Sequence, residues 1–148
     1  QLSTPDILYE KPENSFVAKF IGENNTLNGV VKEINGSTCE VDLDNNHGVV
    51  KALKVNVSEV GEKTQLSIRP ERVSIDSNNN SSNAFTGKIE ELIYLGDHIR
   101  CRMNVAGDDQ FIMKVPNTSS QLGLEIGASL QIGWQNNDCR ALDFKELV

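Results

Sequence analysis

The chain has 148 residues, of which 38% are apolar and 5% aromatic, and its 14 Lys and Arg stand against 21 Asp and Glu. That length fits one domain of ordinary size or two small modules. The formal net charge of -7 argues against a protein that binds nucleic-acid phosphates, which needs a cationic surface. No stretch approaches the roughly 20 apolar residues that span a bilayer. Because the chain begins at Gln1 without a leader sequence, we expect a piece of a longer soluble protein.

Helical signals are confined to residues 1–22, which we expect to form two short helices. Thr4-Pro5 is typical of an N-cap followed by proline at the first helical position, and Pro12 ends this turn. Asn14 can cap a second helix. Its apolar stripe consists of Phe16, Val17, Phe20 and Ile21. Helices this short are marginal alone, so the stripe predicts packing on a partner surface, either the segment that follows or a domain absent from this chain.

From Thr26 onward, apolar and polar residues alternate with the period of two that is typical of strands. The clearest runs are Thr38–Leu43 and Ile99–Val105. Turn signals such as Asn35-Gly36 and Gly107-Asp108 separate such runs. Short strands at this spacing favour small barrels or sandwiches over a sheet with alternating helices.

An internal repeat divides the strand-rich part. The sequence LNGVVKEI at 27–34 is matched by FTGKIEEL at 85–92, and the pattern of 60–68 recurs at 126–134. We therefore predict an all-β fold of two five-stranded barrels, with a helical segment at 1–22, a first repeat at 23–77, a flexible polar linker at 78–83 and a second repeat at 84–148. Modules of roughly 55–65 residues are marginal alone, so we expect strand exchange or close packing between the halves, and a homodimer.

No catalytic constellation is recognisable in the sequence. A phosphate-binding Gly-x-x-x-x-Gly-Lys-Ser/Thr loop and a Gly-x-Ser-x-Gly elbow are both absent. His47 and His98 each lack a second histidine at ligand spacing, which favours solvated side chains. Cys39, Cys101 and Cys139 contain no Cys-x-x-Cys pair, which favours half-buried thiols over a disulfide framework or a zinc site. We therefore expect no catalytic residue and no metal site.

The densest cluster of charged residues is Arg69-Pro70-Glu71-Arg72. Proline ends a strand there and leaves Arg69 and Glu71 at its rim. One interpretation is a surface ion pair that contributes about 0–1 kcal/mol to stability. The other is a contact with a partner.

Four segments, in chain order, resemble the C-terminal part of the ATP-binding subunits of ABC importers. TPDILYEKPENSFVAKFIGENNTLNG, at 4–29, resembles the end of the nucleotide-binding domain as it runs into the regulatory domain. The others are LSIRPERVSI at 66–75, ELIYLGDHIRCRM at 91–103 and IGASLQIGWQNNDCRALD at 126–143. Within the family, the segment at 94–97 together with that at 27–33 is most similar to the polyamine type, which imports putrescine or spermidine.

This resemblance implies an OB-like regulatory domain, often called the transport-associated domain. It implies that the nucleotide-binding motifs, with ATP and Mg, lie in a preceding domain, so that this fragment is itself no enzyme and holds no cofactor. The resemblance implies an interface or regulatory role for five residues, which are Arg69, Glu71, Tyr94, Gly96 and Trp134. It implies packing on the missing ATPase domain for Phe16, Val17, Phe20 and Ile21. The implied partners are a second copy, that ATPase domain and membrane permease subunits, which places the chain in the cytoplasm against the inner membrane.

Two further functions stay open at this point, and a third is disfavoured. The acidic charge motivates a polyamine cation as a feedback ligand. The repeated barrels also suit a module that captures an oxyanion such as molybdate, because backbone amides bind anions without basic residues. A nucleic-acid-binding barrel needs aromatics interleaved with basic residues, and no aromatic alternates with Arg100 and Arg102. No nucleic-acid partner is therefore expected.

Overall fold

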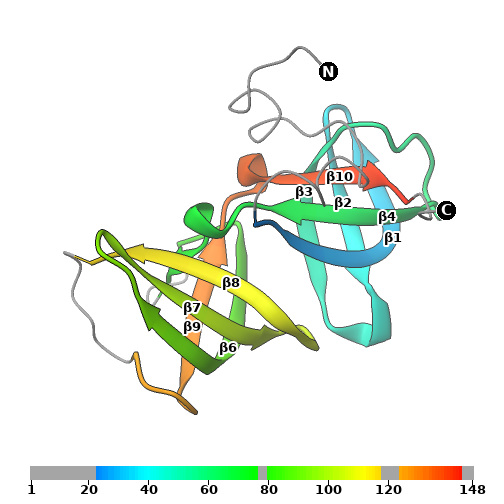
Figure 1. Cartoon of the computed structure of the whole chain (residues 1–148). Helices are drawn as coiled ribbons and strands as arrows, with labels where there is room; N and C mark the ends of the chain where they lie inside the picture. The colour runs from blue at the N-terminus through cyan, green and yellow to red at the C-terminus, as the bar shows by residue number, and fades with distance from the viewer. Residues whose placement is uncertain (1–22, 77–79, 118–123, 145–148) are drawn as a thin grey trace, which may run out of the picture.

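The computed structural model describes residues 23–76, 80–117 and 124–144 (Figure 1). Within these ranges the regular structure consists of strands and 3-10 turns of three residues, so the all-β prediction is confirmed. No helix in the described ranges is long and apolar enough to cross a membrane. The two helices expected at 1–22, with Phe16, Val17, Phe20 and Ile21, lie outside the described residues.

Each repeat contributes five strands in the same order. The first repeat forms β1 (Asn25–Asn35), β2 (Thr38–Leu43), β3 (Val49–Lys54), β4 (Lys63–Ile68) and β5 (Ser74–Ile75). The second forms β6 (Asn83–Tyr94), β7 (His98–Val105), β8 (Asp108–Pro116), β9 (Ser129–Trp134) and β10 (Cys139–Asp143). Matching 3-10 turns precede the fifth strand of each repeat, η2 (Pro70–Arg72) and η3 (Asn136–Asp138), and η1 (Asp44–Asn46) follows β2.

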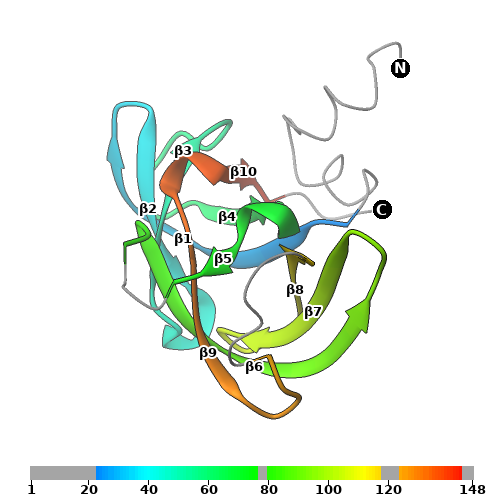
Figure 2. The same cartoon turned by 90° about the vertical axis from the view of Figure 1, so that its left-hand side faces the viewer.

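The two repeats exchange their fifth strands (Figures 1 and 2). A closed barrel has the order β1-β2-β3-β10-β4, and an open sheet has the order β5-β9-β6-β7-β8. Strand β10 pairs antiparallel with β4, with Cys139 opposite Ile68, and β5 pairs antiparallel with β9, with Ser74 opposite Gly133. The predicted boundaries at 23–77 and 84–148 therefore do not separate two structural units, because the last strand of each repeat completes the other one. The second unit is an open five-stranded sheet beside the closed barrel, and the prediction of two small barrel-like units with strand exchange between the halves is confirmed.

Two asparagines at matching positions join the units. Asn25 donates from Nδ2 to the carbonyl of Ile112 in β8 and accepts at Oδ1 from its N–H, both at 2.8 Å. Asn83 likewise donates from Nδ2 to the carbonyl of Lys51 in β3 at 2.9 Å, and it accepts at Oδ1 from the N–H of Lys51 at 2.7 Å. A carboxamide carries a donor and an acceptor side by side, so each side chain pairs with a strand backbone as a neighbouring strand would.

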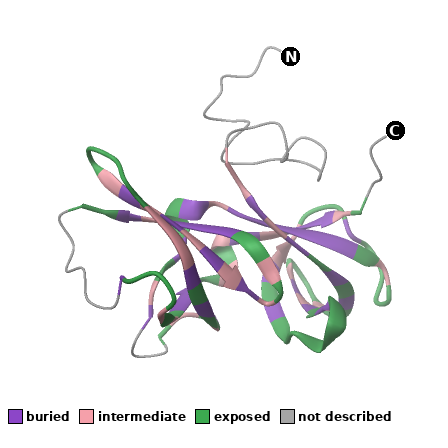
Figure 3. Cartoon of the chain, turned by 60° about the horizontal axis from the view of Figure 1, so that its bottom comes forward, coloured by how far each residue is buried: buried purple, intermediate pink, exposed green. Residues whose placement is uncertain are grey.

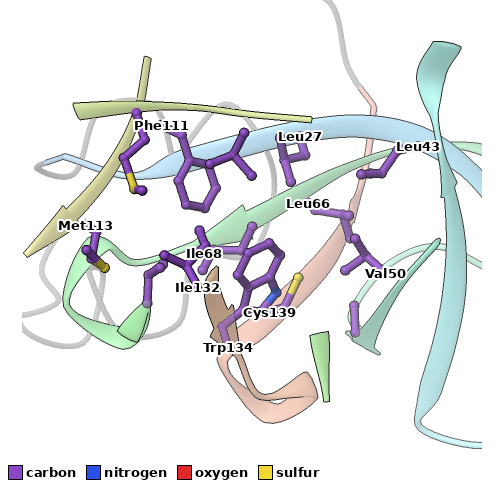
Figure 4. Close-up of a cluster of buried hydrophobic side chains, with 14 of the residues drawn as sticks. Leu27, Leu43, Val50, Leu66, Ile68, Phe111, Met113, Ile132, Trp134 and Cys139 are labelled. Atoms are coloured by element: carbon purple, nitrogen blue, oxygen red, sulfur yellow. The ribbon is translucent and has the colours of Figure 1, made fainter. Parts of the chain in front are cut away.

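One hydrophobic core serves both units (Figures 3 and 4). Inward positions of the strands alternate with outward ones, as β7 shows, in which Ile99, Cys101, Met103 and Val105 are all 0% exposed. Trp134 from β9 stacks on Phe85, with ring centroids 5.3 Å apart, and lies against Phe111 at 5.6 Å. Leu66 and Ile68 from β4 complete the same cluster. Neither repeat could bury these side chains alone.

The glycine shared by the repeat motifs is required by packing. A Cβ on Gly29 would lie 2.4 Å from the carbonyl oxygen of Asp42, and one on Gly87 would lie 2.6 Å from the methyl carbon of Met103. Beyond each glycine the strand has a bulge, after Val31 in β1 and after Ile89 in β6. Such bulges increase local twist and help a short strand curve around a small barrel.

The predicted linker at 78–83 is anchored in its described part. The Asp76 carboxylate accepts hydrogen bonds from the N–H groups of Asn80 and Ser81, at 2.8 Å and 3.1 Å. Asn83, at its end, is 3% exposed and belongs to β6. Burial raises the pKa of Asp76, but these hydrogen bonds outweigh it and hold the pKa below the ordinary value of 3.8. Residues 80–83 therefore act as a fixed turn rather than a free spacer.

Candidate functional site

Arg69 and Glu71 lie where β4 ends and η2 begins. Pro70 occupies the first position of η2, where its fixed φ suits a helical turn, and it is buried. Arg69 Nη1 lies 3.7 Å from Glu71 Oε2, and the side chain of Arg69 is only 13% exposed against 42% for Glu71. The guanidinium is therefore largely buried in the fold, whereas the carboxylate is presented to solvent.

Tyr94 and Gly96 form the tip of the β6–β7 hairpin. The turn closes through hydrogen bonds between the backbones of Leu95 and His98, at 2.9 Å and 3.3 Å, and Asn117 donates to the carbonyl of Gly96 at 3.2 Å. Tyr94 is 63% exposed and Leu95 40%. A Cβ on Gly96 would meet no atom within 4 Å, so this glycine faces open space.

Glu71 and this hairpin lie on one face of the molecule. A shallow hollow there is lined by Glu71, Asp97, His98, Lys114 and the end of β8. We call the set Glu71, Ile93, Tyr94, Leu95, Asp97 and His98 the hairpin face. It combines three exposed apolar side chains with two carboxylates, a composition typical of a protein contact. Glu71 thus lies beside Asp97 and His98 at the end of the hairpin, whereas Tyr94 and Gly96 do not line this hollow, and their interface role stays a prediction.

His98 departs from the solvated side chain expected. Its Nδ1 lies 2.7 Å from Asp97 Oδ1, and its Nε2 is buried without a hydrogen-bond partner. The hydrogen bond from His98, together with the backbone and the charge of the imidazole, holds the pKa of Asp97 below its ordinary value of 3.8. The imidazole is therefore fixed in position rather than free to rotate in water.

An ion cluster beside the hairpin face ties the first described residue to the open sheet. Glu23 pairs with Arg100 of β7 through Nε and Nη2, and with Lys114 of β8 at 3.1 Å. Glu91 lies 3.7 Å from Arg100 and 3.5 Å from Arg102. The hydrogen bond from Arg100 is the main reason that the pKa of Glu23 lies below 4.5. This cluster fixes where the chain enters the fold.

Trp134 does not lie on a surface. It is 1% exposed and packs between Phe85 and Phe111 in the shared core (Figure 4). A buried ring cannot touch a partner, so the interface role expected for Trp134 is corrected to a core role. In the segment at 126–143 that resembles the importer family, Trp134 therefore contributes to packing between the repeats.

A cavity of about 320 Å³ lies where the two repeats meet, at the C-terminal ends of their second strands, β2 and β7. It is open to solvent and is lined by the start of β1, the loop from Asp44 to His47 and the turn from Ala106 to Asp108. We call it the junction cavity. Its charged side chains are Asp44 and Asp108, and no Lys or Arg lines it. Burial is the main reason that the pKa of Asp108 lies above its ordinary value of 3.8, and the neighbouring charge of Asp109 adds to the effect.

The described residues hold no constellation for metal or thiol chemistry. They contain no group of three or more His, Cys, Asp or Glu that could bind a metal ion. Cys39, Cys101 and Cys139 are buried free thiols. Burial raises the pKa of Cys101 to about 11, and it raises that of Cys139 against a smaller opposing effect of the Trp134 indole. Protonated buried thiols are poor nucleophiles and poor ligands.

The sequence did not point to the junction cavity. Asp44 and His47 belong to one repeat and Asp108 to the other, and about 60 positions separate them along the chain. The available signal was the pair of turn motifs, His47-Gly48 and Gly107-Asp108, at matching places in the repeats. Turn chemistry explained each motif alone, so nothing suggested that the two turns face each other.

Comparison with known proteins identifies a family to which this chain belongs. A family model described as a TOBE domain matches residues 66–142. The spermidine/putrescine import ATP-binding protein PotA of Trichodesmium erythraeum is 31% identical over 149 residues, covering 96% of this chain and 39% of that protein. The PotA protein of Pseudomonas aeruginosa is 30% identical over 141 residues, covering 91% of this chain and 38% of that protein. The chain thus spans under two-fifths of the length of these relatives.

A solved structure shares the fold. A crystal structure of the cytoplasmic molybdate-binding protein ModG, with molybdate bound, superposes with a TM-score of 0.68 over 81% of this chain and 96% of that one. The sequence identity is 15%, so this likeness concerns the arrangement of strands alone.

Proposed function

This chain belongs to the TOBE domain family, and from that premise we propose that it is the C-terminal regulatory and dimerisation domain of the ATP-binding subunit of a polyamine importer. The single observation that carries the proposal is the similarity to PotA proteins along 91–96% of this chain. The chain covers 38–39% of those proteins, so the ATPase activity, with its ATP and Mg, belongs to the remainder of the whole protein.

In the whole protein this domain would hold two ATP-binding subunits together between catalytic cycles. Two ATPase domains joined through a permanent contact have a raised effective concentration for each other. Their closure on ATP is therefore an intramolecular step that needs no new diffusional encounter. Permease subunits would then hold the assembly at the cytoplasmic side of the inner membrane. Light scattering on the whole protein without nucleotide tests the tether: we expect a dimer that persists without ATP, and a monomer would contradict it.

The hairpin face is the surface that we assign to communication with the ATPase domain. It lies beside Glu23, where the chain enters this domain, and it exposes Tyr94 and Leu95. The substitutions Tyr94→Ala and Leu95→Ser remove exposed apolar area and should leave folding intact. We expect them to uncouple ATP hydrolysis from transport in the whole importer. Val60→Ala, an equally exposed apolar position in the turn before β4, is the matched control.

A cytosolic polyamine is the feedback ligand that the proposal favours. The chain carries a net charge of -7, so polycations are attracted to it. A ligand that binds one arrangement of the domain preferentially would bias the cycle of the attached motor. ATPase assays on the whole protein with rising spermidine test this, with inhibition at cytosolic concentrations as the expected result.

An oxyanion-binding module is the second candidate, and the ModG fold is what favours it. The absence of Lys and Arg from the junction cavity speaks against an anion there. Calorimetry with molybdate separates the two candidates: we expect no saturable heat, and micromolar binding would favour the oxyanion module instead.

A further inference from the structure

We propose that the outer face of β4 and β10 is the docking surface for residues 14–22 of the same chain, which precede the first repeat. This surface, the β4–β10 face, comprises Asn24, Gln65, Ser67, Arg140 and Leu142. The residues that pack on it form the apolar stripe of Phe16, Val17, Phe20 and Ile21. The sequence left two surfaces open for that stripe, and the burial of β4 and β10 favours the one within the chain.

Strand β4 is buried on both of its faces. All residues in the range Thr64–Ile68 are at most 5% exposed. Leu66 points into the shared core, so Gln65 and Ser67, which alternate with it, point to the outer side. An outward position elsewhere in the same barrel, Lys51 of β3, is exposed. The exterior of β4 is therefore covered, unlike that of an ordinary barrel strand.

The covered exterior continues onto β10. Leu142 is 0% exposed although it does not belong to the shared core, and it lies opposite Gln65. In the described part of the chain, Gln65 Oε1 and Asn24 Oδ1 are shielded from solvent and accept no hydrogen bond. Carboxamide oxygens on an open exterior would be hydrated. The shielding of both oxygens and of Leu142 indicates an apolar cover.

The internal repeat supplies a comparison for this cover. The repeat alignment places Gln65 of β4 where the second repeat has Gln131 of β9. The same side chain is 5% exposed in the first repeat and exposed in the second. The sequences before the two repeats differ in the same sense, because residues 77–83 are only Ser and Asn, whereas 14–22 carry the apolar stripe. The cover therefore coincides with the segment that the second repeat lacks.

The path of the chain brings this segment to the β4–β10 face. Asn24 donates from Nδ2 to Ser67 Oγ at 2.5 Å, so the chain reaches β1 along the rim of the face. Leu142 lies two positions further along, about 7 Å away at strand spacing. A helix of nine residues is about 13 Å long, which is enough to extend over Leu142. Gly22 suits a left-handed C-cap, which lets the chain reverse between such a helix and Glu23.

Docking would make the entry to this domain rigid. A helix this short is marginal alone, so it depends on a packed apolar face for its stability. If the function proposed above holds, the ATPase domain is attached through a packed segment rather than a free linker. A movement of that domain would then be transmitted directly to β4 and β10.

Nuclear magnetic resonance on the whole 148-residue chain tests the contact. We expect nuclear Overhauser effects between the methyl groups of Leu142 and the rings of Phe16 and Phe20. A mixture of labelled and unlabelled chains should show that these contacts form within one chain. Absence of the contacts would overturn the proposal. Contacts confined to pairs of chains would also overturn it, and would identify a second copy as the occupant.

Trypsin cleavage after Lys19 measures the strength of docking, because a packed helix is protected. The double variant Phe16→Ser and Phe20→Ser should be cleaved about tenfold faster or more. Serine and phenylalanine have similar helix propensities, so this effect reports packing. Ala18→Ser lowers the helix propensity of the same segment and leaves the stripe intact. It is the matched control, and its rate should change less than about twofold.

A change on the β4–β10 face should have the opposite effect. Gln65→Leu replaces a buried carboxamide with a hydrocarbon beside Leu142 and should slow cleavage about threefold or more. Gln131→Leu, at the matching exposed position of the second repeat, is the control and should leave the rate unchanged. Thermal melts confirm that each variant is folded.

The outcomes separate this proposal from the function proposed above. Cleavage at the wild-type rate in the double serine variant would overturn docking, as would equal rates in Gln65→Leu and Gln131→Leu. Neither result affects the tether, which light scattering on the whole protein tests independently. A monomeric whole protein with the expected contacts of Leu142 would contradict the tether and leave docking standing.

Discussion

At the residue scale, two asparagines do what an additional strand would do. Asn25 satisfies the N–H and carbonyl of Ile112, which is 6% exposed, and Asn83 satisfies those of Lys51. Both asparagines are nearly fully buried, at 2% and 3% exposed. A buried backbone group without a partner is costly, so these side chains allow an open strand edge to be covered by another unit.

Replacement of Asn25 by alanine should therefore destabilise the chain strongly. The change leaves a buried N–H and a buried carbonyl of Ile112 without partners, and we expect a loss of about 2–4 kcal/mol in the free energy of unfolding. Urea denaturation measures it. Asn104→Ala, on the half-exposed face of β7, is the control and should cost far less. Equal losses in the two variants would show that the carboxamide pairing contributes little.

The three cysteines should be unreactive in the native state. Cys39, Cys101 and Cys139 are at most 1% exposed, and burial raises the pKa of each thiol above 9. A maleimide or iodoacetamide reagent at pH 8 should label none of them in the folded chain and all three in denaturant, as mass spectrometry would record. Rapid labelling of the native chain would indicate that the barrel opens readily.

At the element scale, the charge cluster at Glu23 links the entry of the chain to β7 and β8. One carboxylate pairs with Arg100 and Lys114 from adjacent strands. An ion pair that bridges elements holds them in register more effectively than an isolated surface pair. Because Glu23 is 38% exposed, solvent screens the interaction and its contribution is about 1 kcal/mol or less.

The pH dependence of this contribution has a definite sign. The pKa of Glu23 is lower in the folded chain than its ordinary value of 4.5, so the stabilisation is complete above that pH and is lost as the pH falls through the folded pKa. Glu23→Gln should be less stable than wild type at pH 7, and the difference should vanish in acid. Glu125→Gln, in the exposed turn before β9, is the control for general charge. A difference that persists unchanged in acid would contradict the ion-pair explanation.

At the scale of the whole molecule, the exchange of β5 and β10 makes the repeats one cooperative unit. Strand β10 closes the first barrel although it is the last strand of the chain, and one core contains residues of both repeats. A repeat of this size buries too little apolar surface for independent stability. Exchange of the fifth strand and a shared core increase the apolar surface that both repeats bury.

Damage to β10 should consequently unfold both units together. Ala141 is 0% exposed and lies opposite Leu66, so Ala141→Asp puts a carboxylate into the barrel core and should cost about 4 kcal/mol or more. Hydrogen exchange at Ile89 and Cys101 of the open sheet should accelerate with that of the barrel. Arg140→Gln, whose side chain is half exposed, is the control. Protection of the open sheet that survives in Ala141→Asp would show two independent units.

The sequence by itself determined the strands, the repeat and the family. Alternation of period two locates strands such as Thr38–Leu43, because side chains of a strand point to opposite faces, and the repeated glycines report positions where a Cβ has no room. The tertiary structure alone decided which strands pair, that Trp134 lies in the core, and that Asp44 and Asp108 line the same hollow. The physical reason is range: alternation and turns depend on neighbours along the chain, whereas strand exchange and cavities depend on residues that meet only when distant segments pack.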